Sequence, residues 1–146
     1  MGKLFRRLFP NKEMRAYLKM NRKHRKELIK LAKEFCEWDW IYLHRFVMTI
    51  IKHFHEYYSA GNNVWQSDET LIPIIKQLKY ILYLDKEIEK VVDDDLDVEY
   101  VEEDGKVTAV FPDDFINRMN ENEEKEQQLY EELYGSIGKN LKWWWD

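Results

Sequence analysis

With 146 residues, 45% of them hydrophobic and 15% aromatic, the chain is long enough to bury one core and too apolar for a disordered segment. Its net charge of −5 hides a strong polarity, because residues 1–33 hold twelve Lys and Arg against two acids, whereas residues 85–134 hold nineteen Asp and Glu against five bases. No apolar run reaches the roughly eighteen residues of a membrane span, since Lys52 and His53 interrupt the best candidate, residues 41–54.

The N-terminal third of the chain is basic and helical in pattern. Residues 1–11 form a basic amphipathic lead that Pro10 closes, and Asn11 can cap the helix that follows. From Lys12 to about Cys36 the apolar residues recur at helical spacing. This apolar stripe lapses over residues 21–25, so a kink there, or a break into two helices, is an alternative to one continuous helix.

Two further helices are predicted in the middle of the chain. Residues 39–58 carry apolar side chains on more than one face, which is typical of the most buried helix of a domain. A turn cluster at residues 59–63 ends it. The next helix starts at Ser67 or Thr70, keeps its period to about Val92, and tolerates Pro73 because this residue lies within the first two turns.

After Val92 the apolar period changes from helical to alternating. Residues 97–111 alternate around Asp104-Gly105, a pair suited to the positive φ angles of a type I′ hairpin turn. Asp113 can cap a last helix that runs to about Tyr134, before Gly135 and Gly138. The predicted fold is therefore α+β and mainly α, with four to five helices around one core and a small β-hairpin near residues 97–111. In this organisation residues 1–11 are the lead, 12–134 one helical domain that includes the hairpin, and 135–146 a tryptophan-rich C-terminal tail.

Aromatic segments give the chain a resemblance to a known group. The run from Trp38 to Leu43, the aromatic turn at residues 55–58, and the ending from Gly138 to Asp146 are similar to small uncharacterised proteins of tailed bacteriophages. The resemblance covers residues 35–90 and the extreme C-terminus. It implies a phage-encoded accessory protein of the host cytoplasm, leaves association with the virion open, and carries over no activity or site residues.

No motif has the spacing of a catalytic or metal site. Asp93, Asp95 and Asp97 match the first ligand positions of a calcium loop, but Val98 stands where that loop needs Gly and Asp104 where it needs Glu. The histidines lack ligand spacing, and core or surface roles are expected for His24, His44, His53 and His55. Five glycines, all at predicted turns or ends, leave no phosphate-binding loop or nucleophile elbow. We therefore predict that the chain is not an enzyme and uses no metal or cofactor.

The lone cysteine and the basic helix bear on compartment and partner. Cys36 can form no internal disulfide, and with no signal-like segment this indicates a reducing cytoplasm. Six cations recur every three or four residues and share one stripe of the predicted helix: Arg15, Lys19, Arg22, Lys26, Lys30 and Lys33. Such a stripe gains from an anion beside it. The alternatives are the chain's own acidic segment, within the molecule or in a homodimer, nucleic acid, an anionic membrane surface, and an acidic protein partner.

The C-terminal aromatic triplet is the other candidate contact. Trp143, Trp144 and Trp145 either fold back on the core or insert into a partner, because an exposed cluster of this kind would be an unusual apolar patch. These features predict a non-enzymatic, phage-encoded accessory protein that acts by protein–protein interaction. The alternatives are a nucleic-acid-binding accessory protein that uses the basic helix, and an inhibitor of a host defence protein or of its nucleotide signal.

Overall fold

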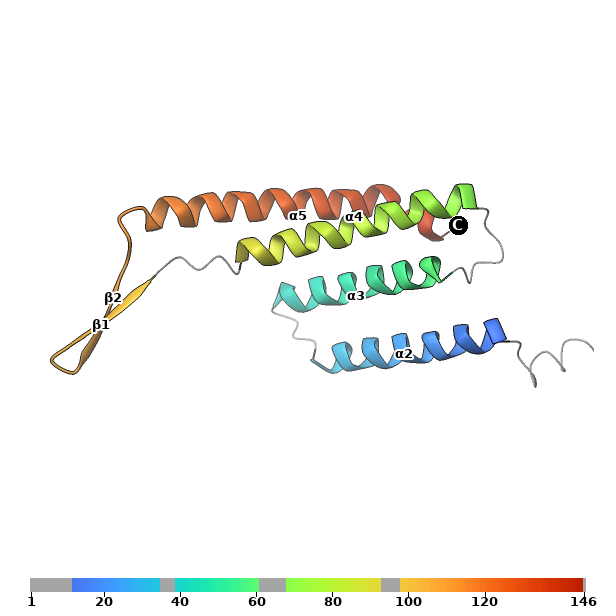
Figure 1. The fold of residues 1–146 in the computed structure, drawn as a ribbon, viewed down its shortest axis with the longest axis horizontal. Helices are drawn as coiled ribbons and strands as arrows, with labels where there is room; N and C mark the ends of the chain where they lie inside the picture. Colours follow the sequence, from blue (N-terminus) through green and yellow to red (C-terminus); the bar gives the residue numbers. More distant parts are fainter. Residues whose placement is uncertain (1–11, 35–38, 61–67, 93–97, 146) are drawn as a thin grey trace, which may run out of the picture. The chain divides into compact units, whose positions relative to one another are not determined.

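The structure, a computed structural model, describes residues 12–34, 39–60, 68–92 and 98–145. Within these ranges the elements are four helices and one two-stranded antiparallel hairpin, which confirms the predicted mainly α, α+β class (Figure 1). The chain divides into two compact units, residues 1–82 and 83–146, and the boundary falls inside α4. The lead at residues 1–11, Cys36 and the aspartates at 93, 95 and 97 lie outside the described residues.

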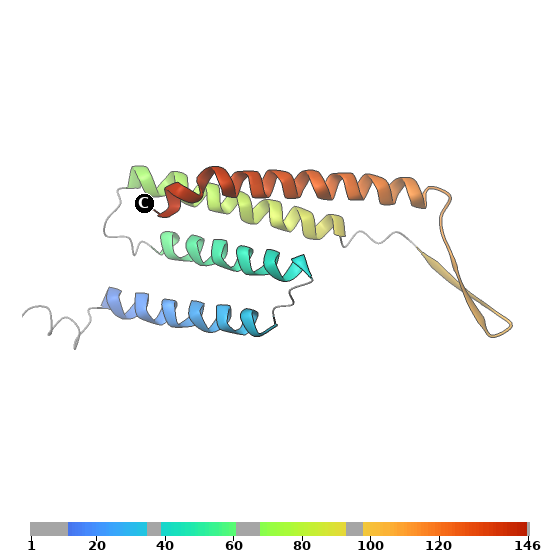
Figure 2. The same cartoon turned by 180° about the vertical axis from the view of Figure 1, so that it is seen from behind.

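The first unit pairs two helices of different character. α2 (Lys12–Glu34) is one continuous helix, so the alternative of a break into two helices at residues 21–25 does not hold; that segment contains no Pro or Gly to interrupt the backbone hydrogen bonds. α3 (Trp40–Ser59) begins after Asp39, whose Oδ1 accepts a hydrogen bond from the Ile41 amide at 3.1 Å. The two helices lie side by side and run antiparallel, as seen from both sides in Figures 1 and 2.

α3 buries side chains on two opposite faces. His44, Met48, Ile51 and Tyr58 recur at helical spacing on one face, and His53 lies on the opposite face, toward α2. Leu43 is exposed, so the helix is less completely enclosed than its apolar sequence suggests. In α2, by contrast, the described side chains are all exposed or half-buried. α2 is therefore attached through a limited set of contacts.

α4 (Asp68–Val92) keeps a regular helical period of buried residues along its length. The predicted start and end are confirmed, and Pro73 lies in the second turn. Its buried residues follow one face throughout: Leu71, Ile74, Leu78, Ile81, Leu84, Ile88 and Val91. None of the helices in the described ranges is long and apolar enough to cross a membrane.

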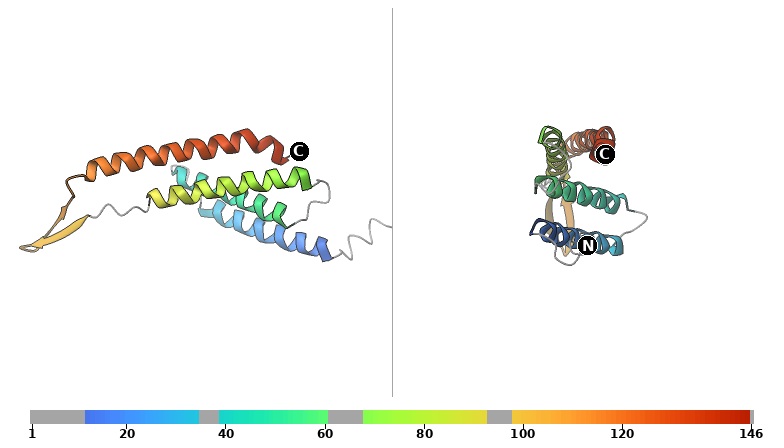
Figure 3. Two further views of the ribbon diagram at one scale, coloured as in Figure 1. Left: turned by 45° about the horizontal axis from the view of Figure 1, so that its top comes forward. Right: turned by 90° about the vertical axis from the view of Figure 1, so that its right-hand side faces the viewer.

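The second unit contains the hairpin and the longest helix. β1 (Glu99–Glu103) pairs antiparallel with β2 (Lys106–Val110) in a hairpin (Figure 3). In this pairing Val101 lies opposite Thr108. Asp104 and Gly105 have φ angles of 53° and 71°, which confirms the predicted turn and its positive-φ geometry. α5 (Phe115–Trp145) follows the hairpin. The carbonyl oxygen of Asp114 accepts a hydrogen bond from the Arg118 amide at 2.9 Å. The N-cap position is therefore Asp114 and not Asp113, the residue that the sequence predicts.

The prediction that the last helix ends near Tyr134 was wrong. α5 continues through Gly135 and Gly138 to Trp145, so most of the predicted C-terminal tail is helical. Each interior glycine costs about 1 kcal/mol of helix stability relative to alanine. One face of this segment buries Leu133, Ile137 and Trp144, and burial of three large side chains outweighs that cost at roughly 1.5–3 kcal/mol each.

Candidate interaction surfaces

The six predicted cations of α2 share one exposed face. Successive residues of a continuous α-helix are rotated by about 100° about its axis. The six cations therefore fall within an arc of about 80° and extend over about 27 Å of the axis of α2. All six side chains are exposed: Arg15, Lys19, Arg22, Lys26, Lys30 and Lys33. We refer to these six residues as the basic face.

A groove of about 620 Å³ lies over the first half of the basic face. Among the described residues it is lined by Arg15, Leu18, Lys19, Arg22, Lys23 and Lys26. Lys30 forms an ion pair with Glu34 on the same helix at 3.9 Å, and Lys23 with Glu56 of α3 at 3.4 Å. Lys19, Arg22 and Lys26 have no ion-pair partner within the described ranges, so the middle of the face keeps its positive charge.

The opposite side of α2 is held to α3 by two reciprocal His–Glu pairs. His24 Nε2 lies 2.9 Å from Glu56 Oε2, and His53 Nε2 lies 2.9 Å from Glu27 Oε2. An ionised carboxylate only accepts hydrogen bonds, so in each pair the imidazole N–H donates. The two imidazole rings stack on each other, with centroids 3.8 Å apart and planes 8° from parallel. We call these four residues the His–Glu clamp.

The clamp changes the acidity of its carboxyl groups. The hydrogen bond from His53 lowers the pKa of Glu27 against the opposing effect of burial, and the charges of Lys52 and Lys23 lower it further. The hydrogen bond from His24 lowers the pKa of Glu56 in the same way, with help from Lys23. Both carboxyl groups are therefore ionised at neutral pH, and each holds one histidine across the helix interface.

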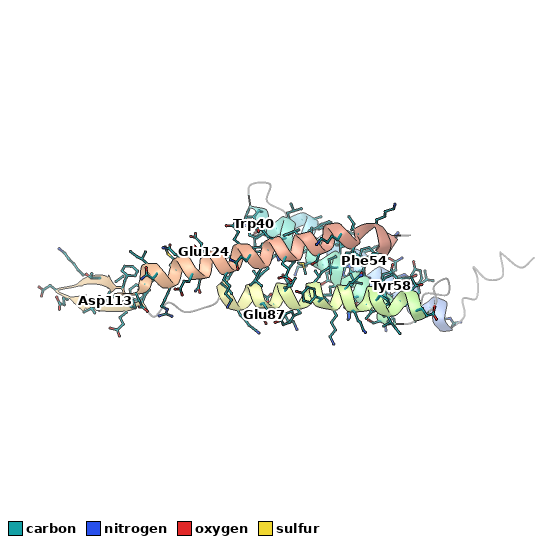
Figure 4. The ribbon with its side chains drawn as sticks, turned by 90° about the horizontal axis from the view of Figure 1, so that it is seen from above. Trp40, Phe54, Tyr58, Glu87, Asp113 and Glu124 are labelled. Atoms are coloured by element: carbon teal, nitrogen blue, oxygen red, sulfur yellow. The ribbon has the colours of Figure 1, made fainter. Side chains whose placement is uncertain are left out.

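Aromatic side chains line a second groove between α2 and α3, of about 290 Å³. Tyr17 meets Tyr57 edge to face with ring centroids 5.8 Å apart, and Tyr57 meets Tyr58 at 5.4 Å. Burial raises the pKa of Tyr57 and of Tyr58, so both hydroxyls stay neutral. Figure 4 labels Phe54 and Tyr58, one turn apart on α3, and Tyr58 is among the buried residues of this interface.

Sequence reasoning missed the clamp, although it noted all four histidines. The signal was present as His-x-x-Glu in both helices, at residues 24–27 and 53–56, which puts each His and Glu one turn apart on one face. His44 is buried beside the Trp40 ring at 5.6 Å, and His55 is half-buried. In the part of the chain that the structure describes, no group of three or more His, Cys, Asp or Glu side chains is arranged to hold a metal ion.

The middle residue of the aromatic triplet, Trp144, is buried in the structure. Trp144 is 2% exposed and lies on the same face of α5 as Leu133 and Ile137. Trp143 and Trp145 belong to the same helix, and their side chains lie outside the described residues. Trp144 is therefore a buried residue of α5, while a partner contact for the triplet stays a prediction.

The hairpin exposes apolar side chains on both of its faces. Tyr100 is 73% exposed and Val107 66%, and Val101 and Val110 are exposed on the other face. Phe111 is also exposed and contacts Phe115 at the start of α5, with ring centroids 4.6 Å apart. Figure 4 labels Asp113 at this junction and Glu124 further along α5, within an acidic helix.

Comparison of the chain with protein-family models, with curated proteins and with solved structures finds no match. The resemblance to phage proteins therefore stays a prediction.

Proposed function

We propose that this chain is a non-enzymatic, phage-encoded accessory protein of the host cytoplasm that binds an acidic surface of a partner protein through the basic face of α2. One observation carries the proposal. The contacts that attach α2 to α3 lie on one side of the helix, and the six cations lie on the other. The helix can therefore bind a partner without leaving its own domain.

The energetics of the basic face favour an anionic partner. Its six cations make five successive like-charge neighbours at spacings of three or four residues. Each such pair costs roughly 0.2–0.5 kcal/mol, so the face stores about 1–2.5 kcal/mol of repulsion that an anionic ligand relieves.

The experiment compares two variants that each lose three positive charges, one on the basic face and one elsewhere as a control. Lys19, Arg22 and Lys26 are replaced by Gln in one variant, and the exposed lysines of α4, Lys76, Lys79 and Lys86, in the other. Tagged copies of both and of the original chain are purified from infected cells with and without nuclease. A protein retained by the original and the control, but lost by the basic-face variant, supports the proposal. Equal capture by both variants contradicts it.

Nucleic acid is the second candidate, and the regular spacing of the basic face favours it. About 27 Å of helix with a cation every turn follows a phosphate backbone without any requirement for base contacts. Binding to a fluorescent DNA should then weaken with salt at a log–log slope of about −3 to −5, for four to five phosphate contacts. The basic-face variant should lose most of this slope, and absence of binding at low salt would remove the candidate.

A further inference from the structure

Within the described residues, the hairpin is a two-stranded sheet with no further strand on either edge and with two exposed faces. All of its strand residues are exposed except Ala109, which is half-buried. A two-stranded hairpin is marginally stable by itself and gains stability from a third strand or from a packed face. The exposed side chains of Tyr100, Val101, Val107 and Val110 are those that such an addition would cover.

The two edges differ in charge. β1 carries Glu99, Glu102 and Glu103 in five residues, and charged side chains of this kind protect a strand edge from pairing. The one charged residue of β2 is Lys106, at its start, and the rest of the strand is Val107, Thr108, Ala109 and Val110. β2 is therefore the edge that is open to another strand.

We propose that the β2 edge pairs antiparallel with β2 of a second copy of this chain, about a two-fold axis at Thr108, to form a four-stranded sheet in the order β1, β2, β2, β1. Thr108 is the middle residue of β2, so this register pairs the strand over its full length. Lys106 then lies opposite Val110 of the partner subunit, and Val107 lies opposite Ala109 of the partner subunit.

The register separates charge from apolar surface. Within one copy Val101 lies beside Thr108, Tyr100 beside Ala109, and Glu102 beside Val107. The two central strands therefore bring the valines and alanines of both copies together, while all the glutamates stay on the outer strands. The two acidic strands are separated by three strand spacings, about 14 Å, which exceeds the Debye length of about 8 Å at physiological salt.

The same charge pattern limits the assembly to two copies. Once both β2 edges are paired, the remaining edges are the acidic β1 strands, which resist further addition. Five residues per strand bury much less than the roughly 1,600 Å² of a standard interface. The association is therefore weak and depends on protein concentration.

Disulfide trapping tests both the pairing and its register. In a Cys36→Ser chain, Thr108→Cys puts two cysteines directly opposite each other on the axis, close to disulfide geometry. Mild oxidation should give a covalent dimer in high yield. Val101→Cys is the matched control, because it lies on the same face, opposite Thr108 within one copy, but on the outer strand. It should cross-link at least tenfold less.

Sedimentation of the full chain at increasing concentration supplies the second measurement. The native chain should shift toward a dimer, and Thr108→Lys, which puts two like charges face to face at the axis, should abolish the shift. Equal cross-linking of the two cysteine variants would overturn the proposal. So would a chain that stays monomeric at every concentration.

Discussion

Replacement of Glu56 by Gln removes one charge from the His–Glu clamp and changes little else in shape. Glu56 accepts hydrogen bonds from His24 at 2.9 Å and from Lys23 at 3.4 Å. A hydrogen bond to a charged group contributes roughly 1.5–3 kcal/mol, and partial exposure of the Glu56 side chain, 31%, reduces this by about half. The exposed Lys23 pair adds at most about 0.5 kcal/mol. Since Gln still accepts a neutral hydrogen bond, we expect a loss of about 1 kcal/mol.

The loss should depend on pH in a defined direction. The pKa of Glu56 lies below its ordinary value of 4.5, so the carboxylate stabilises the folded chain fully above pH 4.5 and progressively less as the pH falls through its folded pKa. The Glu56→Gln chain should therefore be as stable as the original chain in strong acid and less stable at pH 6–7. Hydrogen exchange of the α2 amides reports the attachment of this helix, and 1 kcal/mol corresponds to roughly fivefold faster exchange at neutral pH.

Glu34→Gln is the control, because Glu34 has the same charge and its ion pair among the described residues is with Lys30 on its own helix. It should change exchange by less than about twofold, as expected for an exposed i,i+4 pair. An equal effect of the two substitutions, or a Glu56→Gln effect that is the same at pH 3 and pH 7, would refute the idea that the clamp holds α2. A double-mutant cycle with His24→Asn should give a coupling energy of about 1 kcal/mol.

Three other outcomes are expected. Trp144→Ala should lower the free energy of unfolding in urea by about 3–5 kcal/mol, and deletion of residues 142–146 should lower it by as much. Leu141→Ala, at a position 45% exposed, should lower it by less than about 1 kcal/mol. Gly135→Ala and Gly138→Ala should each raise stability by about 0.5–1 kcal/mol, because neither glycine has a positive φ and an added Cβ meets no atom within 4 Å; a lower melting temperature would contradict this. If the basic residues 1–33 pair with the acidic segment, high salt should destabilise the full chain more than a chain without residues 1–33, and an equal salt response of both would exclude such pairing.

Local sequence alone determined the type of nearly every element. The period of α4 from Leu71 to Val91 and the apolar pattern of residues 39–58 predict helices because their causes lie within a few residues. Asp104-Gly105 predicts the hairpin turn for the same reason, since positive φ angles are a property of those two residue types. The basic face was also readable, because it requires only an unbroken helix.

Tertiary structure decided the features that join distant residues. The His–Glu clamp links positions 26 and 32 residues apart, and no local rule pairs His24 with Glu56 before α2 and α3 pack together. The end of α5 was decided in the same way. Gly135 and Gly138 predict a stop by their own preference, and the helix continues because burial of Leu133, Ile137 and Trp144 contributes more free energy than the two glycines cost.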